Sequence, residues 1–229
     1  MLARFLFPTI LLLFTVRSHA QELSQVTFSG GSNLVYFSLL TEQGVLLRIS
    51  EDGRLLEWGT EAKSINAGDY YAPRLQPFAG RIDYYGVEGD SVSRGKIKMI
   101  GICQISYFTA FEDSTHAGKV RSIGRVFLDF YNKYDNKALR GKLKMIGNYR
   151  LEYFSEFENE SYRGKLRSIG NTQLTYYSNF DDRNNSGKIK SIGPNKYVWY
   201  SAFDRRDMGG ALKVGYYRQA VNGITYILW

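Results

Sequence analysis

Residues 141–163 read GKLKMIGNYRLEYFSEFENESYR, and this stretch decides the fold because similar copies flank it. Gly-Lys pairs open clear copies at residues 95, 118, 141, 164 and 187, always 23 residues apart. A degraded copy starts at residue 210, and RLQPFAGRIDYY (74–85) reads as a worn copy upstream. Five copies in register do not arise from composition. The sequence therefore predicts a repeat region over residues 75–229.

Each copy contains two segments with the residue preferences of β-strands. The first, such as GKLKMIG, has a leucine or β-branched centre between glycines. The second, such as LEYFSEF, is rich in aromatic residues and alternates with period 2. Polar loops ending in glycine join the copies, and no stripe of period 3.6 runs through them. We predict an all-β fold, an antiparallel meander of hairpins curled into a half-pipe or barrel-like sheet or packed on the N-terminal strands.

Alternation along the second segment predicts which face is buried. One face carries a continuous apolar stripe, which we expect to form the core. The expected core positions are Ile105, Tyr107 and Phe111; Leu128, Phe130 and Tyr134; Leu151, Tyr153 and Phe157; Leu174, Tyr176 and Phe180; Tyr197, Trp199 and Phe203. The repeated isoleucine of the first segment (Ile100 in the first clear copy) needs a bulge near the following glycine to face inward.

The opposite face is predicted to carry two parallel ladders, one basic and one aromatic. Both basic residues of each first segment and one aromatic residue of each second segment belong to it. The candidate binding residues are Lys142, Lys144, Lys165, Arg167, Lys188 and Lys190, with Tyr131, Phe154, Tyr177 and Tyr200. These ladders are interpreted either as a solvated sheet face or as a platform for an anionic envelope polymer or a protein partner.

The first 20 residues have the plan of a secretory signal peptide. Arg4 precedes an apolar run from Phe5 to Val16, and small residues lead to Ala20. That run of about 12 residues is too short for a membrane-spanning helix, and no later segment is long enough. We expect export to the periplasm, the outer-membrane surface or the medium of a bacterium, with residues 21–74 forming an N-terminal β region and connection. Nucleic acid is then a poor candidate partner, although the net charge is +8.

The 23-residue hairpin unit resembles the MORN-type β-hairpin repeat family. The resemblance covers residues 95–217 and rests on the period, on Gly141-Lys142-Leu143-Lys144 with the later Gly147, and on the aromatic second segment. The family's usual Gly-x-Trp or Gly-x-Tyr core is absent. The resemblance implies an open sheet of successive hairpins that serves as an interaction or scaffold surface.

The residues that most enzymes use are scarce. After residue 20 the chain has one histidine, His116, and one cysteine, Cys103, so metal clusters, disulfides and most nucleophilic arrangements are not expected. Carboxylates cluster in the loops, where we interpret them as turn residues; the loop DDRNNSG matches no EF-hand spacing. We therefore predict a non-enzymatic exported repeat protein without a cofactor, acting as a structural or binding surface in the cell envelope, with anionic glycans as candidate ligands.

Two alternatives stay open. A secreted glycan hydrolase would use a pair of loop carboxylates as its acid and base. An outer-membrane β-barrel is suggested by the many aromatic strands and the final Trp229. Against the barrel, the expected strands are shorter than the roughly 9–11 residues that span a membrane, and lysine pairs would face lipid.

Overall fold

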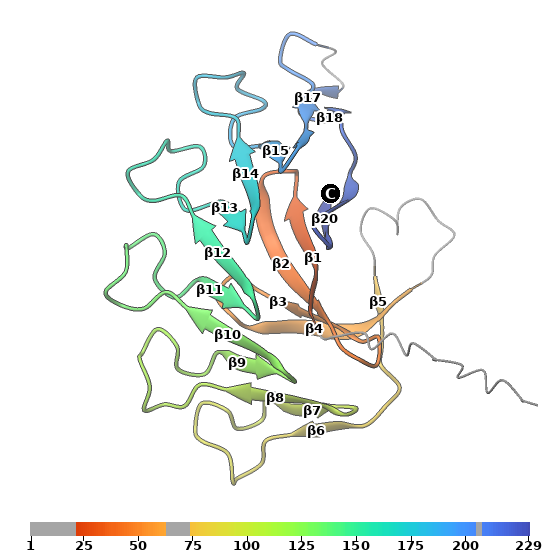
Figure 1. The fold of residues 1–229 in the computed structure, drawn as a ribbon, viewed down its shortest axis with the longest axis vertical. Helices are drawn as coiled ribbons and strands as arrows, with labels where there is room; N and C mark the ends of the chain where they lie inside the picture. The colour runs from red at the N-terminus through yellow and green to blue at the C-terminus, as the bar shows by residue number, and fades with distance from the viewer. Residues whose placement is uncertain (1–21, 63–73, 205–207) are drawn as a thin grey trace, which may run out of the picture.

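The computed structural model describes residues 22–62, 74–204 and 208–229, and all regular secondary structure there is β (Figure 1). The all-β prediction is therefore confirmed. The expected signal peptide lies outside the described residues. Within them, no helix is long and apolar enough to cross a membrane.

A seven-stranded sheet joins the two ends of the chain. Its strand order is β19-β20-β1-β2-β3-β4-β5, and β1 and β20 are the parallel pair. The strands are β1 (Glu22–Ser29), β2 (Asn33–Leu40), β3 (Leu46–Ile49), β4 (Leu55–Glu61), β5 (Leu75–Gln76), β19 (Arg218–Val221) and β20 (Ile224–Leu228). The last two strands of the chain thus share a sheet with the N-terminal strands.

The repeats form an eleven-stranded antiparallel meander in which β6 and β16 are the edges. Its strands are β6 (Ile82–Tyr84), β7 (Ile97–Ile100), β8 (Cys103–Tyr107), β9 (Val120–Ile123), β10 (Val126–Phe130), β11 (Leu143–Ile146), β12 (Tyr149–Tyr153), β13 (Leu166–Ile169), β14 (Thr172–Tyr176), β15 (Ile189–Ile192) and β16 (Asn195–Lys196). A two-stranded ribbon of β17 (Val198–Trp199) and β18 (Leu212–Val214) follows. The meander curls around the N-terminal strands, as predicted (Figure 1).

Two local devices repeat in every clear copy. A two-residue turn connects the paired strands, and its first residue is a glycine with φ between 53° and 59°, as in Gly147. Only that turn residue has a positive φ, which is the requirement of a type II′ hairpin. The second device is a β-bulge at the second basic residue, because Lys144 is skipped where Met145 and Leu143 pair with β10. The bulge sends both Leu143 and Ile146 into the core.

The core lies between the meander and the N-terminal sheet. Two hairpin turns of that sheet insert their backbone carbonyls against the inner side of the repeats. The N–H groups of Val120 and Leu143 donate to the carbonyls of Gly53 and Glu51, at 3.1 and 2.8 Å. The N–H of Ile189 donates to Gly31, at 2.8 Å. The apolar face of the half-pipe is therefore covered by the protein's own N-terminal hairpins.

Candidate binding surfaces

The first lysine of each copy forms a ladder that ties neighbouring copies together. Its ammonium group donates to the carbonyl of the glycine that opens the next copy; for Lys142 and Gly164 the distance is 2.6 Å. It also lies 4.5–5.5 Å from the centroid of the aromatic ring that ends the second strand of its copy. We call these residues the inner lysines: Lys96, Lys119, Lys142, Lys165 and Lys188.

The prediction that both basic residues of a copy line one exposed face is wrong. Lys142 forms an ion pair with Glu51 at 3.1 Å, and Lys165 contacts the Ser32 hydroxyl at 2.6 Å, so both face the N-terminal sheet. Lys188 lies over the buried Trp199 ring. The two basic residues of each copy contact different rings, although these rings adjoin: Tyr131, under Lys144, lies 6.0 Å from Tyr153, under Lys142. These three predicted binding residues therefore have structural contacts.

The second basic residues, which we call the outer basic residues, contact a different set of rings. Each lies over an aromatic ring of the preceding copy, which we call an outer aromatic residue, at 5.3–5.6 Å: Lys98 on Tyr85, Arg121 on Phe108, Lys144 on Tyr131, Arg167 on Phe154, Lys190 on Tyr177 and Lys213 on Tyr200. Such pairs contribute about 0.5–1 kcal/mol when exposed. Several also meet carboxylates, as Lys213 meets Asp204 at 2.9 Å and Arg121 meets Glu112 at 3.4 Å.

From Phe108 to Tyr177 along the chain, the outer aromatic residues alternate between phenylalanine and tyrosine, and their contacts alternate with them. In Tyr131 and Tyr177 the hydroxyl donates to a backbone carbonyl of the next copy, at 2.9 Å. Phe108 and Phe154 lack that donor and instead contact a ring from their own loop. Phe154 lies 4.7 Å from Tyr162, and the Phe108 ring is 5.1 Å from that of His116. The outer rings are therefore mostly packed within the sheet, and Tyr131 is buried.

The most exposed aromatic side chains of the described residues form a third ladder, in the loops. Five aromatic residues spaced by one repeat are 84–96% exposed, and the strands end four residues before them. We call them the loop aromatics: Phe111, Tyr134, Phe157, Phe180 and Phe203. The prediction that these residues belong to the core stripe is wrong. The other predicted core positions, such as Leu151 and Tyr153, are buried or partly buried.

A tight turn holds each loop aromatic in place. In four of the five loops the carboxylate that follows the ring accepts the backbone N–H three residues back, at 2.7 Å for Ser178 to Asp181 and for Ser201 to Asp204. In the Phe157 loop the Glu158 N–H donates to the Ser155 carbonyl at 3.3 Å. The Ser178 hydroxyl also donates to Asp181 and lowers the pKa of that carboxyl. Hydrogen bonding from Lys213 first, and then from Ser201, lowers the pKa of Asp204 to about 2. These carboxylates are turn residues, which agrees with the interpretation of the acidic clusters from the sequence.

Neighbouring loops are also linked to each other. The Ala110 N–H donates to Asp90 at 2.6 Å, and the Ala202 N–H donates to both oxygens of Asp182 at 3.1 Å. Asn159 donates to Asn179 at 2.6 Å. The loops of Phe157, Phe180 and Phe203 are thus hydrogen-bonded in a row, and the Phe111 loop is bonded to the loop before it.

A sequence signal for the loop aromatics exists. Each lies between Ser, Thr or Asn two residues before and Asp or Glu one residue after, a spacing like that of a capping box. That pattern places a turn, not a strand, at the ring. If the strand alternation is continued through this turn, it predicts buried rings, whereas the rings are exposed.

The described residues contain no group of three or more His, Cys, Asp or Glu side chains arranged to hold a metal ion. Burial raises the pKa of the Cys103 thiol to about 11, and the buried His116 ring packs against Phe108 and Phe130. Comparison of the chain with protein-family models, with curated proteins and with solved structures finds no match.

Proposed function

We propose that the chain is a non-enzymatic, exported repeat protein that binds an extended, uncharged glycan along the loop aromatics. One observation carries the proposal: five rings with almost no packing partner recur at the repeat period on hydrogen-bonded loops. Burying such rings on the flat apolar face of sugar rings removes them from water, a favourable contribution for each ring. The MORN-type resemblance, which implies an interaction surface, agrees with this role.

A polymer fits the arrangement better than a small ligand. Successive copies are separated by two strands, about 9–10 Å at the sheet, and the loops fan outward from it (Figure 1). One short sugar therefore meets one ring, whereas a chain meets several. Several weak contacts on one ligand multiply into a useful affinity, provided that the spacing lets them engage together.

The charge of the loops favours an uncharged polymer over the anionic glycan considered from sequence. A carboxylate follows each loop aromatic directly, and carboxylates outnumber basic side chains across these loops. An anionic polymer would instead have to use the outer basic residues, of which Lys144, Arg167 and Lys190 were predicted binding residues. That row also meets acidic partners, as in the pairs of Lys98 with Glu88 and Lys213 with Asp204.

The test is affinity electrophoresis of the protein through gels containing a soluble β-glucan, a xylan or alginate. We expect retardation by a neutral glycan, with roughly tenfold weaker binding, about 1.4 kcal/mol, when Phe157 and Phe180 are both changed to Ala. Changing Glu156 and Arg183 to Ala in the same two loops is the matched control. Because all four side chains project from loops, unfolding curves should stay within about 0.5 kcal/mol of wild type.

Two results would replace this proposal. Retardation only by alginate, removed by high salt and by Lys144→Gln with Lys190→Gln, would assign binding to the outer basic residues. Equal retardation of the aromatic and control variants would exclude the loop aromatics. Export is tested separately: the mature protein should begin near Gln21, after the expected signal peptide of residues 1–20.

A further inference from the structure

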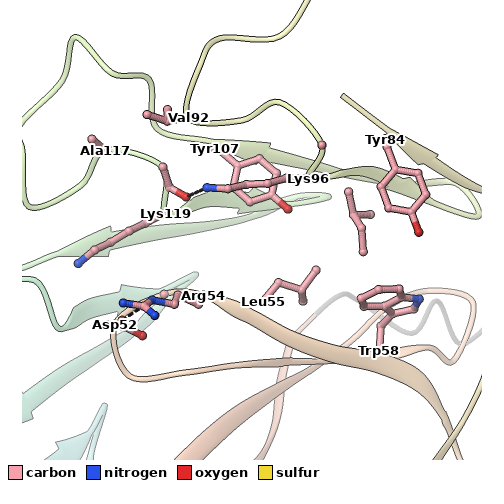
Figure 2. Close-up of a pocket in the computed structure, with 14 residues that line it drawn as sticks. Asp52, Arg54, Leu55, Trp58, Tyr84, Val92, Lys96, Tyr107, Ala117 and Lys119 are labelled. Atoms are coloured by element: carbon pink, nitrogen blue, oxygen red, sulfur yellow. Dashed lines mark hydrogen bonds and ion pairs between the residues drawn. The ribbon is translucent and has the colours of Figure 1, made fainter. Parts of the chain in front are cut away.

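A cavity of about 750 Å³ opens between β4 and the first repeats, away from the loop aromatics. This is the size of ordinary small-molecule sites. Figure 2 shows that its two ends differ: Trp58 and Tyr84 face each other at one end, while Arg54, Lys119 and the Lys96 ammonium lie toward the other. Leu55 points into the space between the ends, and Ile97 and Val92 also line it.

The polar end has an excess of positive charge. Among the residues that line the cavity, Arg54, Lys96 and Lys119 stand against Asp52, which pairs with Arg54 at 2.8 Å. Desolvation, with a smaller effect of Arg54, lowers the pKa of Lys96. An anionic group here would offset the charge that burial and the neighbouring guanidinium make unfavourable.

Other copies show what the position of Lys96 accepts. Lys142, the equivalent inner lysine two copies on, bonds the Gly164 carbonyl and also pairs with the Glu51 carboxylate. Lys165 likewise bonds its glycine carbonyl and reaches the Ser32 hydroxyl. In the described part of the chain, Lys96 bonds the Gly118 carbonyl and lies over Tyr107, with no carboxylate or hydroxyl added. An ammonium group has three donors, so one can still serve a ligand oxygen.

The exposure of Tyr107, the ring under Lys96, agrees with an open site. The rings equivalent to Tyr107 in later copies, such as Phe130 and Tyr153, are at most 6% exposed beneath the N-terminal turns. Tyr107 is only partly buried and lines the cavity. The N-terminal turns thus cover the inner face of later copies and leave that of the first copy accessible.

We propose that this cavity binds a single-chain amphiphile with a carboxylate head, the head at Lys96 and Arg54 and the alkyl chain between Leu55, Trp58 and Tyr84. The ion pair between Glu51 and Lys142 is the equivalent, within the protein, of the proposed contact between the ligand carboxylate and Lys96. The aliphatic and aromatic wall supplies the burial that an alkyl chain needs, since each methylene removed from water adds to the affinity. This site is independent of the proposed glycan surface.

The test is isothermal titration of the full mature protein with dodecanoate, below its micelle concentration. Dodecanol and dodecyltrimethylammonium match its chain with a neutral and a cationic head. We expect one dodecanoate per protein, at least tenfold weaker binding of the alcohol and none of the cation. Lys96→Met should weaken dodecanoate binding about tenfold and bring it near that of the alcohol. Lys188→Met is the matched control, because it removes the same glycine contact outside the cavity.

Trp58→Ala locates the alkyl chain and should weaken dodecanoate and dodecanol equally. Arg54 is exposed, so Arg54→Gln tests the head without disturbing the ladder of inner lysines. Binding of all three amphiphiles with similar affinity, or equal loss in the Lys96 and Lys188 variants, would overturn the proposal. Absence of dodecanoate binding by the folded wild-type protein would overturn it as well. Tighter binding of 2-naphthoate than of dodecanoate would replace the alkyl chain by an aromatic body.

Discussion

Removing one inner lysine tests whether this ladder holds the half-pipe together. In Lys142→Met the stem that packs over Tyr153 is kept, and only the ammonium group is lost. Three contacts disappear: the bond to the Gly164 carbonyl, the ring contact and the pair with Glu51. A hydrogen bond to a charged group contributes about 1.5–3 kcal/mol, and a partly buried cation–π contact about 1 kcal/mol.

The loss of Lys142 also leaves Glu51 without its cation. Desolvation already raises the pKa of that carboxyl, and Lys142 is the main influence that lowers it. Part of this cost is relieved when Glu51 takes up a proton, so we expect a total loss of about 2–4 kcal/mol. Lys144→Met is the control from the same strand: it removes the contact with Tyr131 and should cost about 0.5–1 kcal/mol.

The assay is urea unfolding followed by circular dichroism, in which the midpoint falls while the slope stays constant. Glu51→Gln in both backgrounds completes a double-mutant cycle, and we expect a coupling energy of about 1 kcal/mol. If Lys142→Met and Lys144→Met are equally stable within about 0.5 kcal/mol, the inner lysines are not structural. The distinction between structural inner lysines and the outer basic residues would then lose its energetic support.

Three further predictions concern the docking of the N-terminal turns, pH and modularity. Gly53→Ala should destabilise by several kcal/mol because its Cβ would lie 2.3 Å from the Phe130 ring, whereas Gly44→Ala, also at positive φ but in open space, should cost about 1 kcal/mol in chemical unfolding. Burial lowers the pKa of Lys165 to about 8, so the unfolded chain binds more protons above that pH. Stability should therefore rise from about pH 8 to 9.5 in wild type and rise less steeply in Lys165→Met, in which the other inner lysines with a lowered pKa remain. If copies contacted only their neighbours, deleting residues 141–163, one whole period, would leave a folded β protein. We expect instead that the cooperative unfolding transition is lost, because the contacts of the N-terminal turns and the last strands fit one number of copies. A single sharp transition of the deleted protein would show that the docking adapts.

Period and residue type sufficed to predict the meander, since each copy carries its own turn and strand signals. Gly147 demands a turn, and Leu151 and Tyr153 alternate into the core as expected. The covering of the apolar face was also predictable, because an uncovered sheet would leave those side chains exposed to water. The pairing of β20 with β1 was not predictable, since no local sequence pattern specifies which distant strand pairs with a sheet edge.

The site residues were harder because one bulge reverses the parity of a strand. A strict period of two places Lys142 and Lys144 on the same side, and Leu143 and Ile146 on opposite sides. The observed bulge falls on the second basic residue, not beside the following glycine as expected, and places Leu143 and Ile146 on the same side. Lys142 precedes β11, so strand alternation does not set its direction. Alternation alone therefore could not reveal that three of the six predicted basic residues, Lys142, Lys165 and Lys188, contact the N-terminal turns or a buried ring.

The contrast between inner lysines and loop aromatics bears on which repeated feature carries function. An inner lysine recurs because its ammonium, its ring and the next glycine form one contact, so structure explains its presence. A loop aromatic has no such contact: Phe157 and Phe180 are about nine-tenths exposed, and the hydrogen bonds of their turns are made by neighbouring residues, Ser178 with Asp181 and Glu158 with Ser155. The other loop residues differ between copies, as FENESYR and FDDRNNS show, yet the ring is kept. If duplication alone explained the ring, it should have diverged with its neighbours, because any small polar residue would serve the turn and would expose less apolar surface. Retention of the ring at such a position is what the proposed binding role predicts.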